Sequence, residues 1–366
     1  MPQRTNEAIW LESRGQWQIK VQRDGIRKTF TSTTPGRKGK LQAERRADEW
    51  LKSNMADGSI RFQKLWDGFL DEIQKTTGTA NYEKHDQMGR RWLLPKLKHK
   101  RVGAITRQDY QDCINAGAAA GLSKRSCENI RLSISAVYNY ALNNSMEMAN
   151  PRKLKIPTGA PVGERNILQP DDLKTLFSED TITHYRREHK CFYIYAWRLI
   201  VLLGLRRGEA CGLQRQDIEG KVLHIKRSIN SKNEETRGKN ENAQRYIVLG
   251  KRAASVLEDQ ADMLKATGII SPWVFPDEYG DRSDPNRIYK QWLTYRTQHG
   301  IKSSIHEMRH TFVSVAKADM PETLLKRVIG HSKSMDTFGT YGHDVDGELE
   351  RAANIADGIF DNLLQE

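Results

Sequence analysis

Side chains that can act on a phosphate ester gather near the C-terminal end of the chain. His306 and Arg309 are three residues apart, a spacing that places both on one face of a helix. The pair favours an anion, because the planar fork of an arginine matches a phosphate at two points. His331 follows Gly330, a residue type that commonly ends helices, and Tyr341 stands beside a glycine. A tyrosine oxygen can be a covalent nucleophile when neighbouring groups stabilise the phosphate that it attacks.

A further arginine motif lies upstream, in the sequence Gly204-Leu205-Arg206-Arg207-Gly208-Glu209. Together with His306-x-x-Arg309, Gly330-His331-Ser332 and Tyr341, this motif resembles the signature of the tyrosine recombinases, the phage integrase family. The Gly-Leu-Arg alignment selects Arg206 as the first catalytic arginine, with Glu209 as its supporting hydrogen-bond acceptor. Each motif alone is short and arises by chance, and Arg206 could be only a structural partner of Glu209. The prediction therefore depends on the order and joint occurrence of the motifs.

The resemblance also implies a catalytic lysine in a loop between two strands. Lys239 precedes Arg245-Tyr246-Ile247-Val248-Leu249 and is similar to the family pattern Lys-Thr … Arg-x-Val-Pro-Leu. Asn240 and Val248 depart from that pattern. Lys232, in the same loop, remains the alternative to Lys239.

Each of these residue types has a place in phosphodiester cleavage. The reaction requires charge neutralisation at two non-bridging oxygens, deprotonation of the nucleophile and protonation of the leaving group. Arginines are always charged and suit the oxygens, and histidines titrate near neutral pH and can carry the proton. Lys239 could protonate the 5′-hydroxyl leaving group. The resemblance implies that Tyr341 forms a 3′-phosphotyrosine, which stores the energy of the phosphodiester, so no ATP, metal ion or other cofactor is expected.

Composition and charge narrow the class of partner. The chain has 366 residues and a net charge of +13. Residues 1–60 hold 12 Lys and Arg against 7 Asp and Glu, residues 61–157 hold 17 against 9, and the remainder holds 30 against 30. A segregated basic surplus favours a polyanion, since each neutralised phosphate releases counterions, although a merely soluble basic surface is the alternative. Four dispersed cysteines and the lack of any apolar run of ~20 residues predict a cytoplasmic, nucleoid-associated protein.

Residues 1–57 are predicted to form a small three-stranded sheet with one helix. Apolar and polar residues alternate over residues 17–21, Asp24-Gly25 is a hairpin signal, and residues 26–33 read as the returning strand. A third strand is expected over 9–12, a glycine- and lysine-rich loop over 35–40 and a helix over 41–53. The module resembles the arm-binding domain of many integrases, and its candidate DNA contacts form one basic face: Lys20, Arg23, Arg27 and Lys28. A solvated sheet edge explains these charges equally well.

Residues 60–151 are predicted to form a four-helix domain that resembles the core-binding domain of the family. Apolar residues recur at three- and four-residue steps from residue 62 to 73, and further helices are expected over 81–93, 107–116 and 124–143. The last helix carries an apolar stripe interpreted as core: Ile130, Ile134, Val137, Tyr138 and Leu142. Further candidate DNA contacts lie before the third helix and in a predicted linker over residues 152–163: Lys96, Lys98, Lys100, Arg101, Arg152, Lys153 and Lys155.

Residues 164–366 are predicted to form a mostly helical catalytic domain. Helices are expected over residues 168–177 and 192–203, strands over 222–225 and 246–249, and a helix at 323–329 before Gly330. The tail, 346–366, has the pattern of an amphipathic helix, which can pack on its own chain or on a neighbouring protomer. The expected fold is therefore mainly α with small β-sheets, in three domains.

The motifs together predict a site-specific DNA recombinase, the integrase of a phage or conjugative transposon. Three alternatives remain open: a chromosome-dimer resolvase, which shares the chemistry, a type IB topoisomerase, and a non-enzymatic DNA-binding protein. The resemblance implies double-stranded DNA with core and arm attachment sites as the partner, and a homotetramer on that DNA. An excisionase and a host DNA-bending protein are further possible partners, and no membrane is expected.

Overall fold

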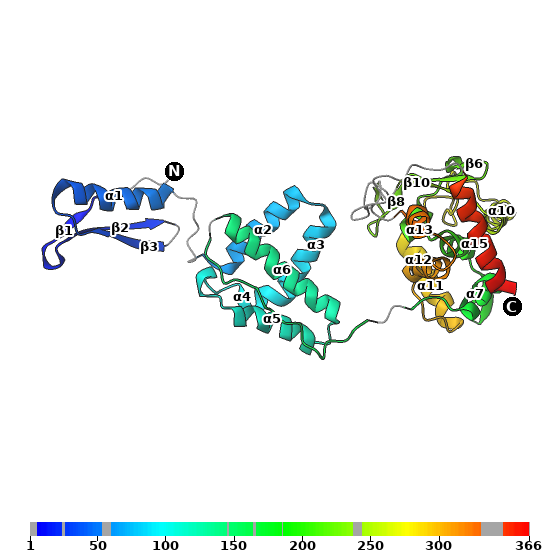
Figure 1. Ribbon diagram of the computed structural model, residues 1–366, viewed down its shortest axis with the longest axis horizontal. Helices are drawn as coiled ribbons and strands as arrows, with labels where there is room; N and C mark the ends of the chain where they lie inside the picture. Colours follow the sequence, from blue (N-terminus) through cyan, green and yellow to red (C-terminus); the bar gives the residue numbers. More distant parts are fainter. Residues whose placement is uncertain are drawn as a thin grey trace. The chain divides into compact units, whose positions relative to one another are not determined.

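The computed structural model divides into two compact units, Met1–Glu164 and Arg165–Glu366, each shown in Figure 1. It describes residues 6–23, 26–52, 60–144, 146–163, 166–184, 186–236, 244–330 and 347–365. Buried apolar residues form three separate clusters, two in the first unit and one in the second. None of the helices within the described ranges is long and apolar enough to span a membrane. The mainly helical fold with small antiparallel sheets confirms the predicted fold class.

The N-terminal part of the first unit is a three-stranded antiparallel sheet with one helix. Strands β1 (Ile9–Leu11), β2 (Gln16–Arg23) and β3 (Ile26–Ser32) lie in the order β1-β2-β3. Ile19 and Val21 of β2 pack on α1 (Gly36–Lys52) through Ala43 and Ala47. The predicted loop over 35–40 was wrong, because the helix already begins at Gly36. The predicted turn at Asp24-Gly25 lies outside the described residues.

The second part of this unit is helical, as predicted. Its helices are α2 (Phe62–Thr76), α3 (Thr79–Met88), α4 (Leu94–Leu97), α5 (Arg107–Ala119) and α6 (Lys124–Asn143). The helix expected over 81–93 is divided into α3 and a π-helical turn, after which the short α4 begins. Thr106 caps α5 in a reciprocal arrangement with Asp109, and Ser123 accepts a hydrogen bond from the Ser126 amide at the start of α6. A short π-helical turn joins α3 to α4 where Gly89 lies against the Trp66 indole.

The apolar stripe of α6 is buried only in part. Ile130, Ile134 and Val137 are at most 1% exposed, whereas Leu142 is 50% exposed. Position 141 continues the three- and four-residue series, and Ala141 is fully buried there instead. Including Leu142 in the core was therefore wrong.

Residues 152–163 lie against the helical core. Leu154 and Ala160 are buried in its apolar cluster, and the Lys124 amide donates a hydrogen bond to the Pro161 carbonyl at 2.7 Å. The boundary between the two compact units follows at Glu164. The segment for which the sequence predicts a linker thus packs on the helices that precede it.

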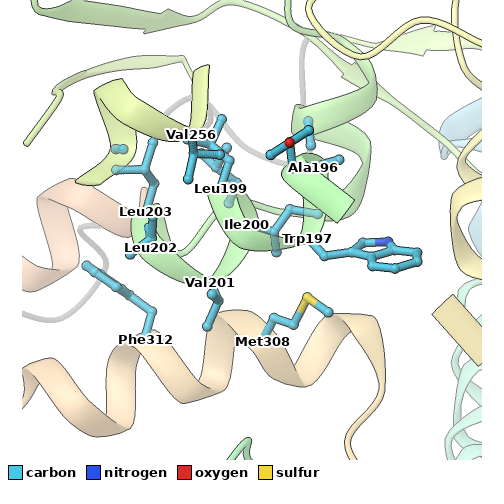
Figure 2. Packing of buried hydrophobic residues seen from close by; sticks show 14 of the residues in the cluster. Ala196, Trp197, Leu199, Ile200, Val201, Leu202, Leu203, Val256, Met308 and Phe312 are labelled. Carbon is cyan, nitrogen blue, oxygen red and sulfur yellow. The ribbon is translucent and has the colours of Figure 1, made fainter. Parts of the chain in front are cut away.

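The second unit is built around one fully buried helix, α8 (Ile194–Leu203). All ten of its residues are buried, as the strongly apolar sequence predicts, and the one charged residue among them, Arg198, donates from Nε to the Leu176 carbonyl at 2.8 Å. Its residues contact α12 (Ile305–Ala316) through Met308 and Phe312, and α10 (Lys251–Ala266) through Val256, as Figure 2 shows. Each large apolar side chain buried in this way contributes about 1.5–3 kcal/mol of transfer free energy. The site described below is attached to the C-terminal end of this helix.

The remaining elements surround α8. Helices α7 (Pro170–Ser178), α11 (Pro285–Gln298) and α13 (Glu322–Ile329) complete the core together with the short α9 (Arg207–Cys211). A three-stranded antiparallel sheet has the order β10-β7-β6, with β6 (Ile218–Glu219), β7 (Val222–Ile225) and β10 (Arg245–Val248). Two hairpins were not predicted: β4–β5 (Thr181–His184 and Arg187–Lys190) and β8–β9 (Ser228–Ile229 and Glu235–Thr236).

The C-terminal helix α15 (Glu348–Gln365), red in Figure 1, packs on its own chain. Leu349, Ala352 and Phe360 are buried against α7, α12, α13 and β10. The Asp357 carboxylate caps the first turn of α10, where it accepts hydrogen bonds from the backbone amides of residues 251 and 252. The sequence left two locations open for this helix, and the fold of the single chain selects the one in cis.

Candidate active site

The first arginine motif lies in the turn between α8 and α9. Gly204 ends α8 with φ 62°, a left-handed conformation that reverses the chain and that glycine adopts without strain. A Cβ atom at this position would lie 2.6 Å from Phe312 Cδ1, so close packing also requires glycine. Arg206 follows at the N-cap of α9, three residues before Glu209. The turn thus fixes the direction in which Arg206 leaves the core.

Arg206 is held by Glu209 and by the end of α13. Its backbone amide donates to Glu209 Oε2 at 2.9 Å, and its Nη1 donates to Oε1 at 2.7 Å. Its Nη2 donates to the Gly330 carbonyl at 3.3 Å. The side chain remains 25% exposed, which leaves the guanidinium accessible to a ligand.

Arg309 connects the same two segments from α12. Its Nη1 donates to the Gly204 carbonyl at 2.7 Å and its Nη2 to the Ile329 carbonyl at 2.6 Å. The residue is 7% exposed, and burial, followed by the charge of Arg206, lowers the pKa of Arg309 to about 10. It is still a cation at neutral pH. The two carbonyls use two of the five N–H donors of its guanidinium.

Glu209 is the buried anion of the cluster, 1% exposed. It accepts hydrogen bonds from Arg206 and from Arg245, whose Nη1 and Nη2 lie 3.1 and 3.0 Å from its two carboxylate oxygens. Burial alone would raise the pKa of this carboxyl, but the Arg245 charge and the hydrogen bonds from both arginines hold the pKa of Glu209 below its usual value. Glu209 is therefore ionised at neutral pH and is fully occupied by its partners.

His306 adds a neutral proton carrier to the cluster. It is exposed to solvent, but its neighbours partly desolvate the ring. This partial burial, followed by electrostatic repulsion from His310, Arg309 and Arg206, lowers the pKa of His306 below 6.5, against a smaller opposing effect of Glu307. The His306 and His310 rings meet edge to face, with their centroids 5.1 Å apart. At neutral pH His306 is thus free to accept a proton.

The charges of this cluster favour an anionic ligand. Three guanidinium groups, those of Arg206, Arg245 and Arg309, stand against two carboxylates in the part of the site that the structure describes, Glu209 among the arginines and Glu307 near His306. The resulting excess of positive charge lies beside a neutral imidazole. An arrangement of this kind binds a phosphate diester and stabilises additional negative charge that develops on it.

The structure brings together four of the predicted site residues: Arg206, Glu209, His306 and Arg309. The other three catalytic candidates, Lys239, His331 and Tyr341, lie outside the described residues. The alternative lysine, Lys232, stands in the turn between β8 and β9. That turn is anchored to the beginning of α11, because Asn286 donates to the Ser231 carbonyl and Arg282 to the Asn233 carbonyl.

Sequence reasoning missed Arg245 as a member of the site. Its side chain is 6% exposed, and besides Glu209 it contacts the Val328 carbonyl, to which Nε donates at 2.6 Å. The sequence feature that could have identified Arg245 was its position as the arginine of the Arg-x-Val-Pro-Leu-like pattern. In the sequence analysis that pattern served only to locate Lys239.

The predicted basic face of the N-terminal sheet is divided in the structure. Lys20 and Arg27 lie on the face away from α1, since their neighbours Ile19 and Val21 point toward the helix. Lys28, opposite Val21, shares the helix side, where its ammonium lies 5.9 Å from the Trp50 ring centroid. Nothing is described of the Arg23 side chain. Grouping Lys28 with Lys20 was wrong, because Lys28 pairs with Val21, which follows Lys20 on β2 and therefore faces the opposite side of the sheet.

The basic candidates of the helical part are all exposed. Two of them contact α5: Lys100 pairs with Asp109 at 2.5 Å, and Lys96 donates to the Asp112 carbonyl at 3.0 Å. Lys153 and Lys155 line an open groove with Arg107 and neighbouring polar residues of α5. Lys98, Arg101 and Arg152 complete the exposed set.

Comparisons with known proteins identify the family and the fold of the chain. Residues 166–348, half of the chain, match the phage integrase family. The ICEBs1 integrase of Bacillus subtilis (strain 168) is 21% identical over 369 residues, covering 94% of this chain and 98% of the relative. The fold is similar to the Tn1549 transposon integrase in complex with transposon right end DNA, at a TM-score of 0.64 and 16% identity, over 81% of this chain and 99% of that one. It is also similar to a lambda integrase dimer bound to a COC′ core site, at a TM-score of 0.59 and 14% identity, over 94% of this chain and 99% of that one.

The family match covers the buried helix, both arginine motifs and the segment that contains Tyr341. The chain therefore belongs to the phage integrase family, the tyrosine recombinases.

Proposed function

We propose that Arg206, Arg309, His306, His331, Lys239 and Tyr341 act on one scissile phosphate, with Glu209 as their support. The chain is a site-specific recombinase that breaks and rejoins DNA strands through a 3′-phosphotyrosine. Such a recombinase integrates and excises a mobile element, and the integrase relatives support that role.

The proposed reaction follows from the charges of the site. The Tyr341 oxygen attacks phosphorus, the bond to the 5′ oxygen breaks, and Lys239 gives that oxygen its proton. Arg206 and Arg309 bind the two non-bridging oxygens, for which each has unused N–H donors. His306, neutral at working pH, takes the phenolic proton or passes it to His331. The reverse sequence, with another 5′-hydroxyl as nucleophile, rejoins the strand.

One observation carries this proposal. Arg206 and Arg309 come from segments about a hundred residues apart, yet both donate hydrogen bonds to the backbone at the end of α13, at Gly330 and Ile329. These carbonyls directly precede His331 in the sequence. The fold therefore brings both arginines to the residues at which the Gly330-His331-Ser332 motif begins.

A nicked suicide substrate tests the nucleophile. Its short 5′ fragment diffuses away after cleavage, so a covalent intermediate accumulates. We expect the wild-type protein to form an adduct that protease digestion traces to Tyr341, and Tyr341→Phe to bind the duplex equally well without an adduct. An adduct in Tyr341→Phe, or none in the wild type, would refute the assignment. Relaxation of supercoiled DNA without any recombinant product would favour a type IB topoisomerase instead.

The lysine assignment has its own test. A substrate with sulfur at the bridging 5′ position has a leaving group that needs no acid. We expect Lys239→Ala to cleave this substrate nearly as fast as the wild type, while it cleaves the ordinary substrate at least about 10²-fold more slowly. Lys232→Ala is the matched control, and the opposite pattern between the two variants would assign the proton to Lys232.

We further propose how the chain is arranged on DNA. Residues 60–366 would grip core sites as a tetramer, with residues 60–151 and 164–366 as the two domains of the clamp and 152–163 on the backbone between them. Residues 1–57 would bind arm sites. Relatives bound to DNA as a dimer and as a tetramer support this arrangement. An excisionase, a host DNA-bending protein and a cytoplasmic, nucleoid-associated location complete the proposal.

A further inference from the structure

Arg245 connects strand β10, helix α9 and helix α13 of the catalytic unit, and its guanidinium group is buried. It begins strand β10, just after the loop that contains Lys239. Both of its terminal nitrogens donate to Glu209, and its Nε donates to the Val328 carbonyl in the last turn of α13. At 6% exposure it is too enclosed to bind DNA directly. Its contacts therefore act on other residues of the site.

The same carboxylate holds Arg206. Glu209 Oε1 accepts from both Arg206 and Arg245, and Oε2 accepts from the Arg206 amide and from Arg245 Nη2. Without Arg245, Glu209 would be left with Arg206 as its one charged partner and would be free to rotate toward it. The Val328 carbonyl would also lose a donor, one residue before the carbonyl that Arg309 holds.

We propose that Arg245 is a positioning residue, which clamps Glu209 to the end of α13 and so fixes the guanidinium groups of Arg206 and Arg309 around the phosphate. The inference rests on the proposed roles of these two arginines. Lysine cannot replace Arg245, because one ammonium group cannot reach three acceptors that a planar guanidinium contacts at 2.6, 3.0 and 3.1 Å.

Arg227 provides a matched control in the same unit. Its side chain is 14% exposed, pairs with the buried carboxylate of Asp217 and donates to the Gly212 carbonyl at 2.9 Å. Asp217, like Glu209, is 1% exposed. Both arginines thus pair with a buried carboxylate and a backbone carbonyl, but the polar contacts of Arg227 with the described residues include neither Glu209 nor α13.

The experiment compares Arg245→Lys and Arg245→Gln with Arg227→Lys and Arg227→Gln. Single-turnover cleavage of the suicide substrate, the Kd for the same duplex and the melting temperature are measured for each full-length variant. We expect Arg245→Lys to cleave about 10²-fold more slowly, as a misplaced catalytic group does, while its Kd changes less than about threefold. The Arg227 variants should lose melting temperature by a similar amount and keep the cleavage rate. Should Arg245→Gln fail to fold, Arg245→Lys carries the comparison.

Modified phosphates identify the step on which Arg245 acts. A methylphosphonate at the scissile position lacks one negative oxygen, so its cleavage depends less on charge neutralisation by Arg206 and Arg309. The rate difference between Arg245→Lys and the wild type should therefore shrink to within about threefold. A bridging 5′ sulfur should leave the difference unchanged, because Arg245 does not act through the leaving group. If the bridging 5′ sulfur alone removed the rate difference, Arg245 would act by positioning the loop that contains Lys239. That result would overturn the proposal.

Two further results would also overturn it. One is wild-type cleavage by Arg245→Lys, and the other is an equal rate loss in Arg227→Lys, which would show a general effect of stability. Tyr341→Phe is included in every series. If it forms no adduct while Arg245→Lys cleaves normally, the proposed function stands and only this inference fails.

Discussion

At the scale of single residues, the site depends on one buried anion among cations. Glu209 lies between Arg206 and Arg245, and an ionised carboxylate at 1% exposure is stable there only because its partners compensate its lost hydration. Partial burial, followed by the same positive surroundings, lowers the pKa of His306 and keeps it neutral at neutral pH. The cluster thus combines permanent charge on the arginines with an uncharged imidazole, as the proposed roles require.

Replacing Glu209 tests the charge balance. Glu209→Gln keeps the shape but leaves buried guanidinium groups without an anion, so we expect a loss of about 3–5 kcal/mol in the free energy of unfolding at pH 7. Since the folded pKa of Glu209 lies below its unfolded value of 4.5, its stabilisation is complete above pH 4.5 and disappears as the pH falls through the folded pKa. Denaturant titrations should therefore show a shallower acid loss in the variant. Equal slopes for both proteins would contradict this account.

The protonation of His306 can be observed directly. Partial burial, followed by electrostatic repulsion from His310, Arg309 and Arg206, lowers its pKa, so the ring should titrate below pH 6.5 in the DNA-free protein. His310→Asn removes one of these causes and should move the midpoint upward, toward 6.5. NMR of ring-labelled histidine measures both values. A midpoint above 6.5 in the wild type would contradict a lowered pKa of His306.

At the scale of elements, the geometry depends on how three helices end or begin. α8 stops at Gly204, α9 starts with Arg206, and α13 stops at Gly330, where φ is 66°. The C-terminal ends of α8 and α13 leave backbone carbonyls without helical partners, and Arg206 and Arg309 donate hydrogen bonds to them. The helix ends are therefore completed by the same side chains that are proposed to bind the phosphate.

Substituting Gly204 tests the importance of the first terminus. In Gly204→Ala the alanine must adopt a left-handed backbone conformation, and its Cβ also collides with Phe312. In Gly300→Ala the backbone is equally left-handed, at φ 71°, but no atom lies near the Cβ position. We expect about 1 kcal/mol of destabilisation for Gly300→Ala and about 2–4 kcal/mol for Gly204→Ala. Only Gly204→Ala should slow single-turnover cleavage. Equal melting temperatures for the two variants would show that the Phe312 contact is relieved without cost.

At the scale of the whole molecule, the three apolar clusters share no residue. The N-terminal sheet has its own small core, so its removal leaves the buried residues of the other clusters covered. The net positive charge lies entirely within the first 157 residues, while the remaining residues, which include the arginine cluster, carry no net charge. The proposed function therefore divides attraction to DNA and chemistry on DNA between different parts of the chain.

Deleting residues 1–57 tests this division. We expect cleavage of core-site suicide substrates to persist, while binding to arm-type duplexes weakens by at least tenfold and loses much of its salt dependence. Fluorescence anisotropy on both duplexes, over a series of salt concentrations, measures the effect. Lys20→Ala with Arg27→Ala in the full-length chain is the matched variant on the open face of the sheet, and Lys28→Ala is its control on the helix side. Unchanged arm binding after the deletion would remove the role proposed for this module.

The sequence by itself determined the class of protein, the buried helix and the order of the motifs. Apolar periodicity and caps such as Thr106 are local signals, which act between residues a few positions apart. For the same reason α8, α13 and the strands β7 and β10 could be predicted within a few residues.

Only the tertiary structure decided which side chains share a partner. The clamp of Arg245 on Glu209 and Val328, the location of α15 on its own chain and the separation of Lys28 from Lys20 all depend on contacts between distant segments or on which face a neighbour covers. No local pattern records such contacts, because an arginine paired with a buried carboxylate and one that faces solvent have the same composition and spacing. Burial and hydrogen bonding distinguish them, and both arise only when the chain has folded.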